Sequence, residues 1–190
     1  MTHSDVTTVD LDIDALSRSD ILIAAAETDD EIGCVLRIHL MVEQFLTVYV
    51  REKRQPELKA FVSSPREFGQ KLAYSTAFGL PLPIAAVAHQ INNIRNKMAH
   101  NMDQSFNDGD IQQLARLVNQ MSDVDLSFTP VEKRTISLSL KRPGETLTYT
   151  TEGNRIKFLI SSLSFWGTAL RWLIEDAART KIALGLAKTK

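Results

Sequence analysis

Apolar residues recur three or four positions apart over most of the chain, which predicts amphipathic helices. Residues 15–27 predict a short first helix. Residues 28–31 predict the start of a longer helix, because a capping side chain and early acids suit the positive end of the helix dipole. This helix is expected to reach about Arg54. Its stripe holds two polar residues among apolar ones: Ile32, Val35, Leu36, His39, Val42, Glu43, Leu46, Tyr49 and Val50.

The same spacing continues in later segments and predicts helices at about 66–78, 83–101, 110–121 and 154–185. Gly79 is typical of a helix end, whereas Pro81 and Pro83 favour a helix start. Residues 107–110 favour a turn before the next helix. Short connections between amphipathic helices indicate an all-α, antiparallel bundle.

The hydrophobic period changes to two in the last third of the chain. Apolar residues alternate with serine over residues 136–140, which indicates a strand. Residues 142–145 (RPGE) predict the turn to a second strand. We therefore expect a β-hairpin insertion at about 134–151. A lone hairpin is marginally stable, so it must lie on the helices or pair with a second copy.

Composition indicates a soluble protein with one ordinary core. The 190 residues are 44% hydrophobic and 24% charged, and no apolar run reaches the roughly 18 residues of a membrane span. We expect one helical domain over residues 15–185, after a disordered acidic leader at residues 1–14 that lacks the apolar stretch of a secretory signal. The one cysteine, Cys34, excludes an internal disulfide and a cysteine-based zinc cage, and suits a small apolar filler. The expected location is the cytoplasm, without a membrane partner.

The net charge of -1 hides an asymmetry between the two parts of the chain. Residues 1–31 contain nine acids and one base, a charge of -8, whereas the other 159 residues contain 21 bases and 14 acids, a charge of +7. The body is basic enough to permit an anionic partner without requiring one. The acidic segment is either a solvated leader or an arm that shields a basic cleft until a partner displaces it.

The helix expected at 83–101 carries two stripes. Its apolar stripe consists of Ile84, Val87, Ala88, Ile91, Ile94 and Met98. Its second stripe consists of His89, Asn93, Asn96 and His100, spaced four, three and four residues apart. A solvated face usually carries glutamate and lysine, whereas histidine and asparagine suit a polar cleft or a symmetric partner. The second stripe is the candidate functional face, with Asn93 and His89 as supporting residues.

Arg95, Asn96 and His100 carry the groups needed to cleave RNA without a metal or cofactor. Arginine has a permanent charge and a forked donor set that suits phosphate, and histidine exchanges protons near neutral pH. Cleavage through the 2′-hydroxyl needs a proton acceptor, a proton donor and positive charge at the phosphorane. We expect His100 to act as the acid or base, Arg95 to bind phosphate, and Asn96 to orient His100.

Arg95 and His100 do not share a face of a regular helix, because they lie about 140° apart around its axis. They converge if the helix ends near His100 or if Arg95 reaches around the axis. One chain supplies a single such histidine, and in-line transfer is easier with groups on both sides of the phosphorus. A two-fold homodimer would supply the second group.

Structural roles stay open for the same residues. Arg95 and His100 also fit cations at a helix C-terminus, where they satisfy the dipole. His39 and Glu43 lie four residues apart on an apolar stripe. They either satisfy each other, or they are supporting residues of the site, with Glu43 holding Arg95 or His100. His89 fits a structural or interfacial role.

The R-x4-H pattern of Arg95 and His100, with the polar Asn96 directly after the arginine, resembles the HEPN superfamily. Residues 68–74 (FGQKLAY), 79–80 (GL) and 94–100 (IRNKMAH) together look like its mannitol operon repressor-like branch. The resemblance covers about residues 30–120 and 154–175. The hairpin departs from the simple helical pattern of that family.

The resemblance implies a small helical bundle that dimerises. Many HEPN domains are metal-independent endoribonucleases of toxin–antitoxin, abortive-infection and phage-defence systems, with the arginine and histidine as active residues. Others have no known catalysis and act as interaction or regulatory modules. Two hypotheses follow for this chain. It is either an endoribonuclease with RNA and an antitoxin or regulatory protein as partners, or a non-catalytic transcriptional regulator or interaction module, although the sequence has no recognisable helix-turn-helix.

Overall fold

Helices form most of the protein. The computed structural model describes residues 16–54, 60, 61, 63–100 and 105–188, with side chains described up to residue 180. The helices in these ranges are α2 (Ser19–Glu27), α3 (Glu31–Lys53), α4 (Phe68–Ala77), α5 (Leu82–His100), α6 (Asp108–Asn119) and α7 (Asn154–Lys188). A two-stranded antiparallel sheet is formed by β1 (Thr135–Leu138) and β2 (Arg142–Thr148). The expected helices are therefore confirmed, whereas the expected leader at residues 1–14 lies outside the described ranges.

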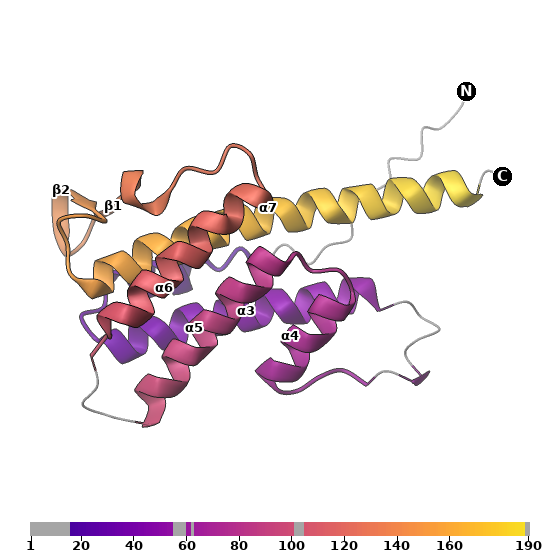
Figure 1. The fold of residues 1–190 in the computed structure, drawn as a ribbon, viewed down its shortest axis with the longest axis horizontal. Helices are drawn as coiled ribbons and strands as arrows, with labels where there is room; N and C mark the ends of the chain where they lie inside the picture. The colour runs from indigo at the N-terminus through magenta and orange to yellow at the C-terminus, as the bar shows by residue number, and fades with distance from the viewer. Residues whose placement is uncertain (1–15, 55–59, 62, 101–104, 189–190) are drawn as a thin grey trace.

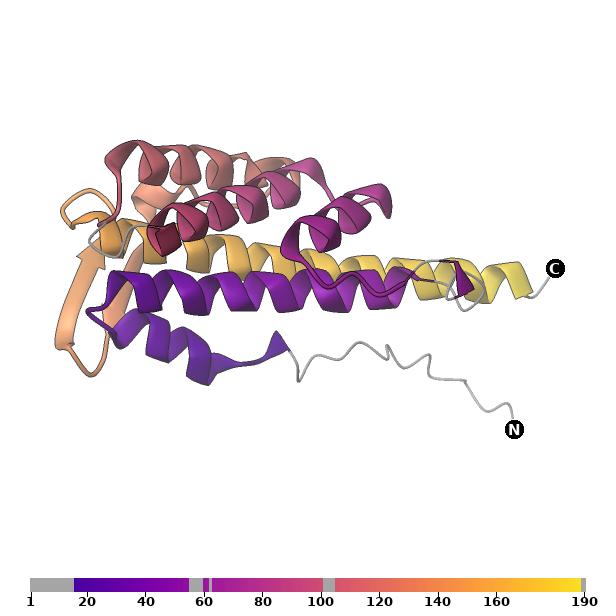
Figure 2. The ribbon, with the colours of Figure 1, turned by 90° about the horizontal axis from the view of Figure 1, so that it is seen from below.

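The helices form layers around the two longest ones. α3 and α7 lie side by side along the length of the molecule (Figures 1 and 2). α4, α5 and α6 cover one side of this pair, and α2 packs against α3 on the other side (Figure 2). The hairpin lies at the end of the bundle where α7 begins (Figure 1). α5 is thereby held between α3, α4 and α6.

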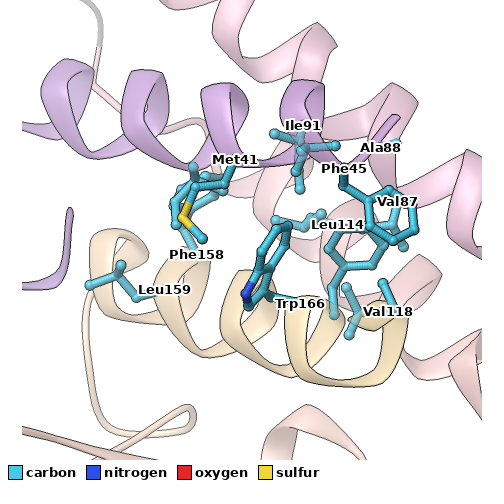
Figure 3. Packing of buried hydrophobic residues seen from close by; sticks show 14 of the residues in the cluster. Met41, Phe45, Val87, Ala88, Ile91, Leu114, Val118, Phe158, Leu159 and Trp166 are labelled. Carbon is cyan, nitrogen blue, oxygen red and sulfur yellow. The ribbon is translucent and has the colours of Figure 1, made fainter. Parts of the chain in front are cut away.

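The predicted apolar stripe of α5 is confirmed as part of the core. All six of its members are buried: Ile84, Val87, Ala88, Ile91, Ile94 and Met98. Phe45 of α3, Ile91 of α5 and Trp166 of α7 gather in one interior (Figure 3). The Phe45 and Trp166 rings meet edge to face, with centroids 6.3 Å apart. Full burial of one such side chain contributes about 1.5–3 kcal/mol, so this stripe fixes which face of α5 turns outward.

α3 is also the one described helix that is long and apolar enough to cross a membrane by length and composition. Of its most apolar stretch, however, 61% is buried inside the protein. The core helix of a soluble protein has the same properties. The cytoplasmic location expected from the sequence therefore stays a prediction.

The junction between α4 and α5 sets where α5 begins. Gly79 has a φ of +93°, a conformation that glycine adopts without the steric cost borne by other residues. The Tyr49 hydroxyl donates to the carbonyl oxygen of Phe78 at 3.0 Å and so ties this turn to α3. The expected end at Gly79 is confirmed, and α5 then runs without interruption to His100.

The hairpin is confirmed, but the turn expected at residues 142–145 is wrong. Arg142 pairs with Leu138, so the turn lies at residues 139–141. The N–H groups of Leu140 and Lys141 both donate to the Glu27 carboxylate, each at 3.0 Å. These two hydrogen bonds hold the turn at residues 139–141, before the expected position. Gly144, with a φ of +80°, instead lies in β2 where the strand register shifts.

Candidate functional site

The end of α5 keeps Arg95 and His100 on different sides of the helix. Arg95 is half-buried, whereas His100 is exposed as the last residue of α5. On a regular helix the two residues lie about 140° apart around the axis. α5 ends at His100, which is one of the two conditions expected to let the pair converge. Within the described part of the chain, however, no hydrogen bond joins His100 to Arg95 or Asn96.

Asn96 contacts Arg95 rather than His100. The Arg95 Nη1 donates to the Asn96 Oδ1 at 2.9 Å. The contact expected from the sequence, an amide that orients the imidazole, is absent among the described residues. The two side chains are neighbours on the helix, and the long arginine bends to reach the amide. Asn96 thus limits the orientations open to the guanidinium.

His39 does not pair with Glu43, contrary to the simpler of the two expectations. Its Nε2 lies 3.0 Å from the Oδ1 of Asn92, which is on α5. The His39 ring also stacks on Phe68 of α4, with centroids 4.6 Å apart and planes at 28°. This side chain is almost fully buried, at 6% exposed. A histidine held in this way has a fixed ring plane and a fixed neighbour at one nitrogen.

Glu43 accepts a hydrogen bond and ion pair from Lys71 of α4, with Nζ and Oε1 2.8 Å apart. Among the described residues it forms no ion pair with Arg95 or His100, so the second expectation for Glu43 is also not met. The physical reason is the docking of α4 on α3, which brings a lysine to the carboxylate. Sequence reasoning missed Asn92 and Lys71 as partners. The signal available for Asn92 was its position three residues before Arg95, on the same side of α5.

These side chains form one group between α3, α4 and α5, which we call the polar cluster: His39, Glu43, Lys71, Asn92, Arg95 and Asn96. Burial lowers the pKa of His39 from its ordinary value of 6.5. The Asn92 contact and the Glu43 charge oppose this shift, whereas Arg95 and Lys71 add to it. With His39 neutral, the cluster contains two cations and one anion. Its single net positive charge favours an anionic ligand.

Arg95 retains an unused donor in this cluster. In the described ranges, its Nε–H is buried and has no hydrogen-bond partner. A buried donor without a partner costs about 1–3 kcal/mol, so such groups are uncommon unless a ligand, ion or water satisfies them. A phosphate oxygen is a suitable acceptor, because arginine can bind it through two parallel N–H groups.

The supporting residues of the predicted stripe, His89 and Asn93, have fewer contacts than the polar cluster. His89 is exposed and Asn93 is half-buried, and neither forms a hydrogen bond with another described residue. The side of α5 that meets α3 and α4 carries Asn92 and Arg95 instead. The face of α5 that carries the polar cluster is therefore rotated from the stripe that residue type alone selected.

The described residues give little support to chemistry by a reactive thiol or by a bound metal ion. Burial raises the pKa of the Cys34 thiol to about 12, so it stays protonated and suits the expected apolar filler. No group of three or more His, Cys, Asp or Glu side chains in the described ranges has the arrangement of a metal site.

No protein-family model, curated protein or solved structure matches this chain. The resemblance to HEPN proteins therefore rests on the residues and motifs of the chain itself.

Proposed function

We propose that this protein is a metal-independent endoribonuclease of the HEPN type that acts as a toxin or phage-defence effector. The observation that carries the proposal is the unused Nε–H donor of Arg95, in a cluster of net positive charge, on the helix that ends with the exposed His100. RNA supplies both the phosphate acceptor and the 2′-hydroxyl nucleophile. We also propose a cytoplasmic location and an antitoxin or regulatory partner.

In the proposed reaction, Arg95 binds the non-bridging phosphate oxygens and stabilises the phosphorane. His100 accepts the proton of the 2′-hydroxyl as its oxygen attacks the phosphorus, and the 5′ oxygen takes a proton from water as the P–O5′ bond breaks; in the opposite assignment, His100 protonates the 5′ oxygen and water accepts the 2′-hydroxyl proton. The products are a 2′,3′-cyclic phosphate and a 5′-hydroxyl. Asn96 acts on the arginine, in line with its hydrogen bond to Arg95.

The proposed site is completed by a second copy of the chain. Arg95 and His100 lie on different sides of one α5, and α5 is helical up to His100. A two-fold dimer that brings the ends of two α5 helices together would place Arg95 of each copy near His100 of the other. The homodimer is thus part of the catalytic proposal.

A second function, a non-catalytic regulator or interaction module, is favoured by one contact. The hydrogen bond from Arg95 to Asn96 partly satisfies the guanidinium inside the protein, as a packing role would require. Under this alternative, which includes a transcriptional regulator resembling the mannitol operon repressor, Arg95 and His100 stabilise the end of α5 only.

The test uses the purified protein with mixed cellular RNA in EDTA. We expect cleavage by the wild type and by Arg116→Gln, which removes an exposed cation of α6 and controls for overall charge. His100→Ala and Arg95→Ala should each lose about 100-fold or more in rate while keeping the wild-type circular dichroism, and His100→Ala should also relieve growth toxicity. Undiminished cleavage by His100→Ala would contradict the catalytic role. Cleavage by none of the folded proteins would favour the regulator.

Mixing the two inactive variants tests the shared site. In a mixed dimer, the intact Arg95 of one copy meets the intact His100 of the other at one of two sites. Random exchange of subunits should therefore restore about a quarter of wild-type activity. A mixture that stays inactive would place both residues of each site in the same chain.

A further inference from the structure

His39 occupies an unusual position for a histidine with no assigned role. It is the buried member of the polar cluster, fixed at Nε2 by Asn92 of α5 and along its ring face by Phe68 of α4. These contacts come from two other helices, so any change of the His39 charge or shape acts on how α4 and α5 sit against α3. The contact to Asn92 acts directly on the helix that carries Arg95.

Arg95 lies next to this contact. Asn92 and Arg95 are three residues apart on α5, so their side chains are neighbours on one side of the helix. Burial is the main cause of the lowered pKa of His39, and the positive charge of Arg95 contributes to it. The two groups therefore share one environment, in which the Nε–H of Arg95 is buried without a partner.

We propose that His39 is a positioning residue for Arg95: the neutral imidazole, fixed by Asn92 and Phe68, holds the guanidinium with its Nε–H available to a phosphate oxygen of RNA. As far as RNA is concerned, this inference rests on the proposed function. It adds a histidine from α3 of the same chain to a site that the motif confines to α5.

The charges around His39 explain why its protonation would disturb the arrangement. Three charged side chains face it from the packed helices: Glu43 of α3, Lys71 of α4 and Arg95 of α5. The one carboxylate among them is already paired with Lys71. A proton on His39 therefore adds a second positive charge beside Arg95 with no free anion to offset it. Repulsion would then shift the guanidinium away from its phosphate-binding orientation.

The first experiment follows the Arg95 Nε–H signal by NMR in the free protein, so it needs no RNA. The signal is assigned by its loss in Arg95→Lys. As the pH is lowered from about 8 until the His39 ring signals report protonation, we expect the Arg95 signal to shift together with them. In His39→Gln, which keeps a donor for Asn92 but cannot be protonated, the Nε–H signal should stay constant over this range.

The second experiment measures binding of 2′-O-methyl RNA, which lacks the nucleophile and cannot be cut. His39→Gln cannot be protonated, so it should lose less affinity on acidification than the wild type does. His39→Phe keeps an aromatic ring against Phe68 but cannot bond to Asn92, and should bind about tenfold more weakly. Asn92→Leu removes the same contact from the side of α5 and should weaken binding to a similar extent. It replaces His39→Phe in the test if that variant does not fold.

The outcomes separate this inference from the proposed function. An Arg95 Nε–H signal that does not shift when His39 of the wild type is protonated would overturn the positioning role, whether or not RNA binds. A signal that follows His39 would support it. If that protein then binds no RNA, the positioning role stands and the ribonuclease proposal fails.

Discussion

The two faces of α5 are built on opposite principles. Its apolar face is buried without exception, and Ile84, Val87 and Ile91 are fully enclosed by α3, α6 and α7. Its polar face meets α3 and α4 through single contacts, such as the one between Asn92 and His39. On that face the Arg95 Nε–H remains without a partner among the described residues.

The two faces of α5 thus contribute differently: the apolar face contributes to folding stability, and the polar face carries the hydrogen-bonding groups. Packing on the apolar face is non-directional and needs only area, so each side chain there contributes to folding. The polar face needs particular partners at particular distances, and it tolerates an unsatisfied donor that costs about 1–3 kcal/mol. Burial of two or three apolar side chains offsets that cost. The apolar face thus offsets the cost of leaving the Arg95 Nε–H without a partner.

The largest expected effect on the free energy of unfolding comes from shortening a buried side chain of the apolar face. Ile91→Ala removes a fully buried side chain and leaves a cavity, so it should lower the free energy of unfolding by about 2–5 kcal/mol. Chemical denaturation measures this loss. Leu82→Ala on the same helix is the control, because Leu82 is 73% exposed and its loss should cost about 0.5 kcal/mol or less. Equal losses would show that the core does not hold α5 as the packing indicates.

A smaller effect is expected in the polar cluster that the polar face of α5 meets, at the ion pair between Lys71 of α4 and Glu43 of α3. Lys71→Met leaves the Glu43 carboxylate partly enclosed without its partner, and the paired side chains are only 13% and 25% exposed. This lies between a surface pair, worth up to about 1 kcal/mol, and a buried pair, whose breaking costs about 3–5 kcal/mol. We expect a loss of about 1–3 kcal/mol in the free energy of unfolding.

A double-mutant cycle with Glu43→Gln isolates the interaction of Lys71 with Glu43 from other effects of each change. The double variant should be less destabilised than the sum of the two single variants. Additive losses would mean that the ion pair contributes nothing, and that α4 is held to α3 by Phe68 and its neighbours alone.

The sequence predicted the apolar face well and the polar face poorly. The stripe from Ile84 to Met98 follows from helical period alone, which is a local property of the chain. The partners of the polar face are not local. Asn92 lies 53 residues from His39, and Lys71 lies 28 residues from Glu43. The order of docked helices decides such pairs, and periodicity does not encode that order.

The hairpin shows the same limit. Alternation located its strands, but the turn was set by Glu27, which lies 113 residues before Leu140. Residue type predicted a turn around Gly144. The Glu27 carboxylate instead holds the turn at residues 139–141. For the candidate site, residue types identified Arg95, Asn96 and His100, but they did not reveal that Asn96 contacts Arg95 rather than His100.

The smallest predicted effect is a dependence of stability on pH, and it tests whether the polar face is strained by charge. Burial lowers the pKa of His39 below the ordinary value of 6.5 that it has in the unfolded chain. The unfolded chain therefore binds a proton first as the pH falls. The stability associated with neutral His39 is fully present above pH 6.5 and is lost as the pH falls from there through the pKa of the folded state.

Urea unfolding of the wild type and His39→Gln across this pH window measures the contribution of that one imidazole. The wild type should lose stability toward acid more steeply than His39→Gln, because the glutamine cannot bind the proton. The difference between the two curves should level off once His39 is protonated in both states. Parallel curves would mean that His39 titrates alike in the folded and unfolded chain. The polar cluster would then accommodate a second positive charge beside Arg95 without cost, and the contrast between the two faces of α5 would reduce to packing alone.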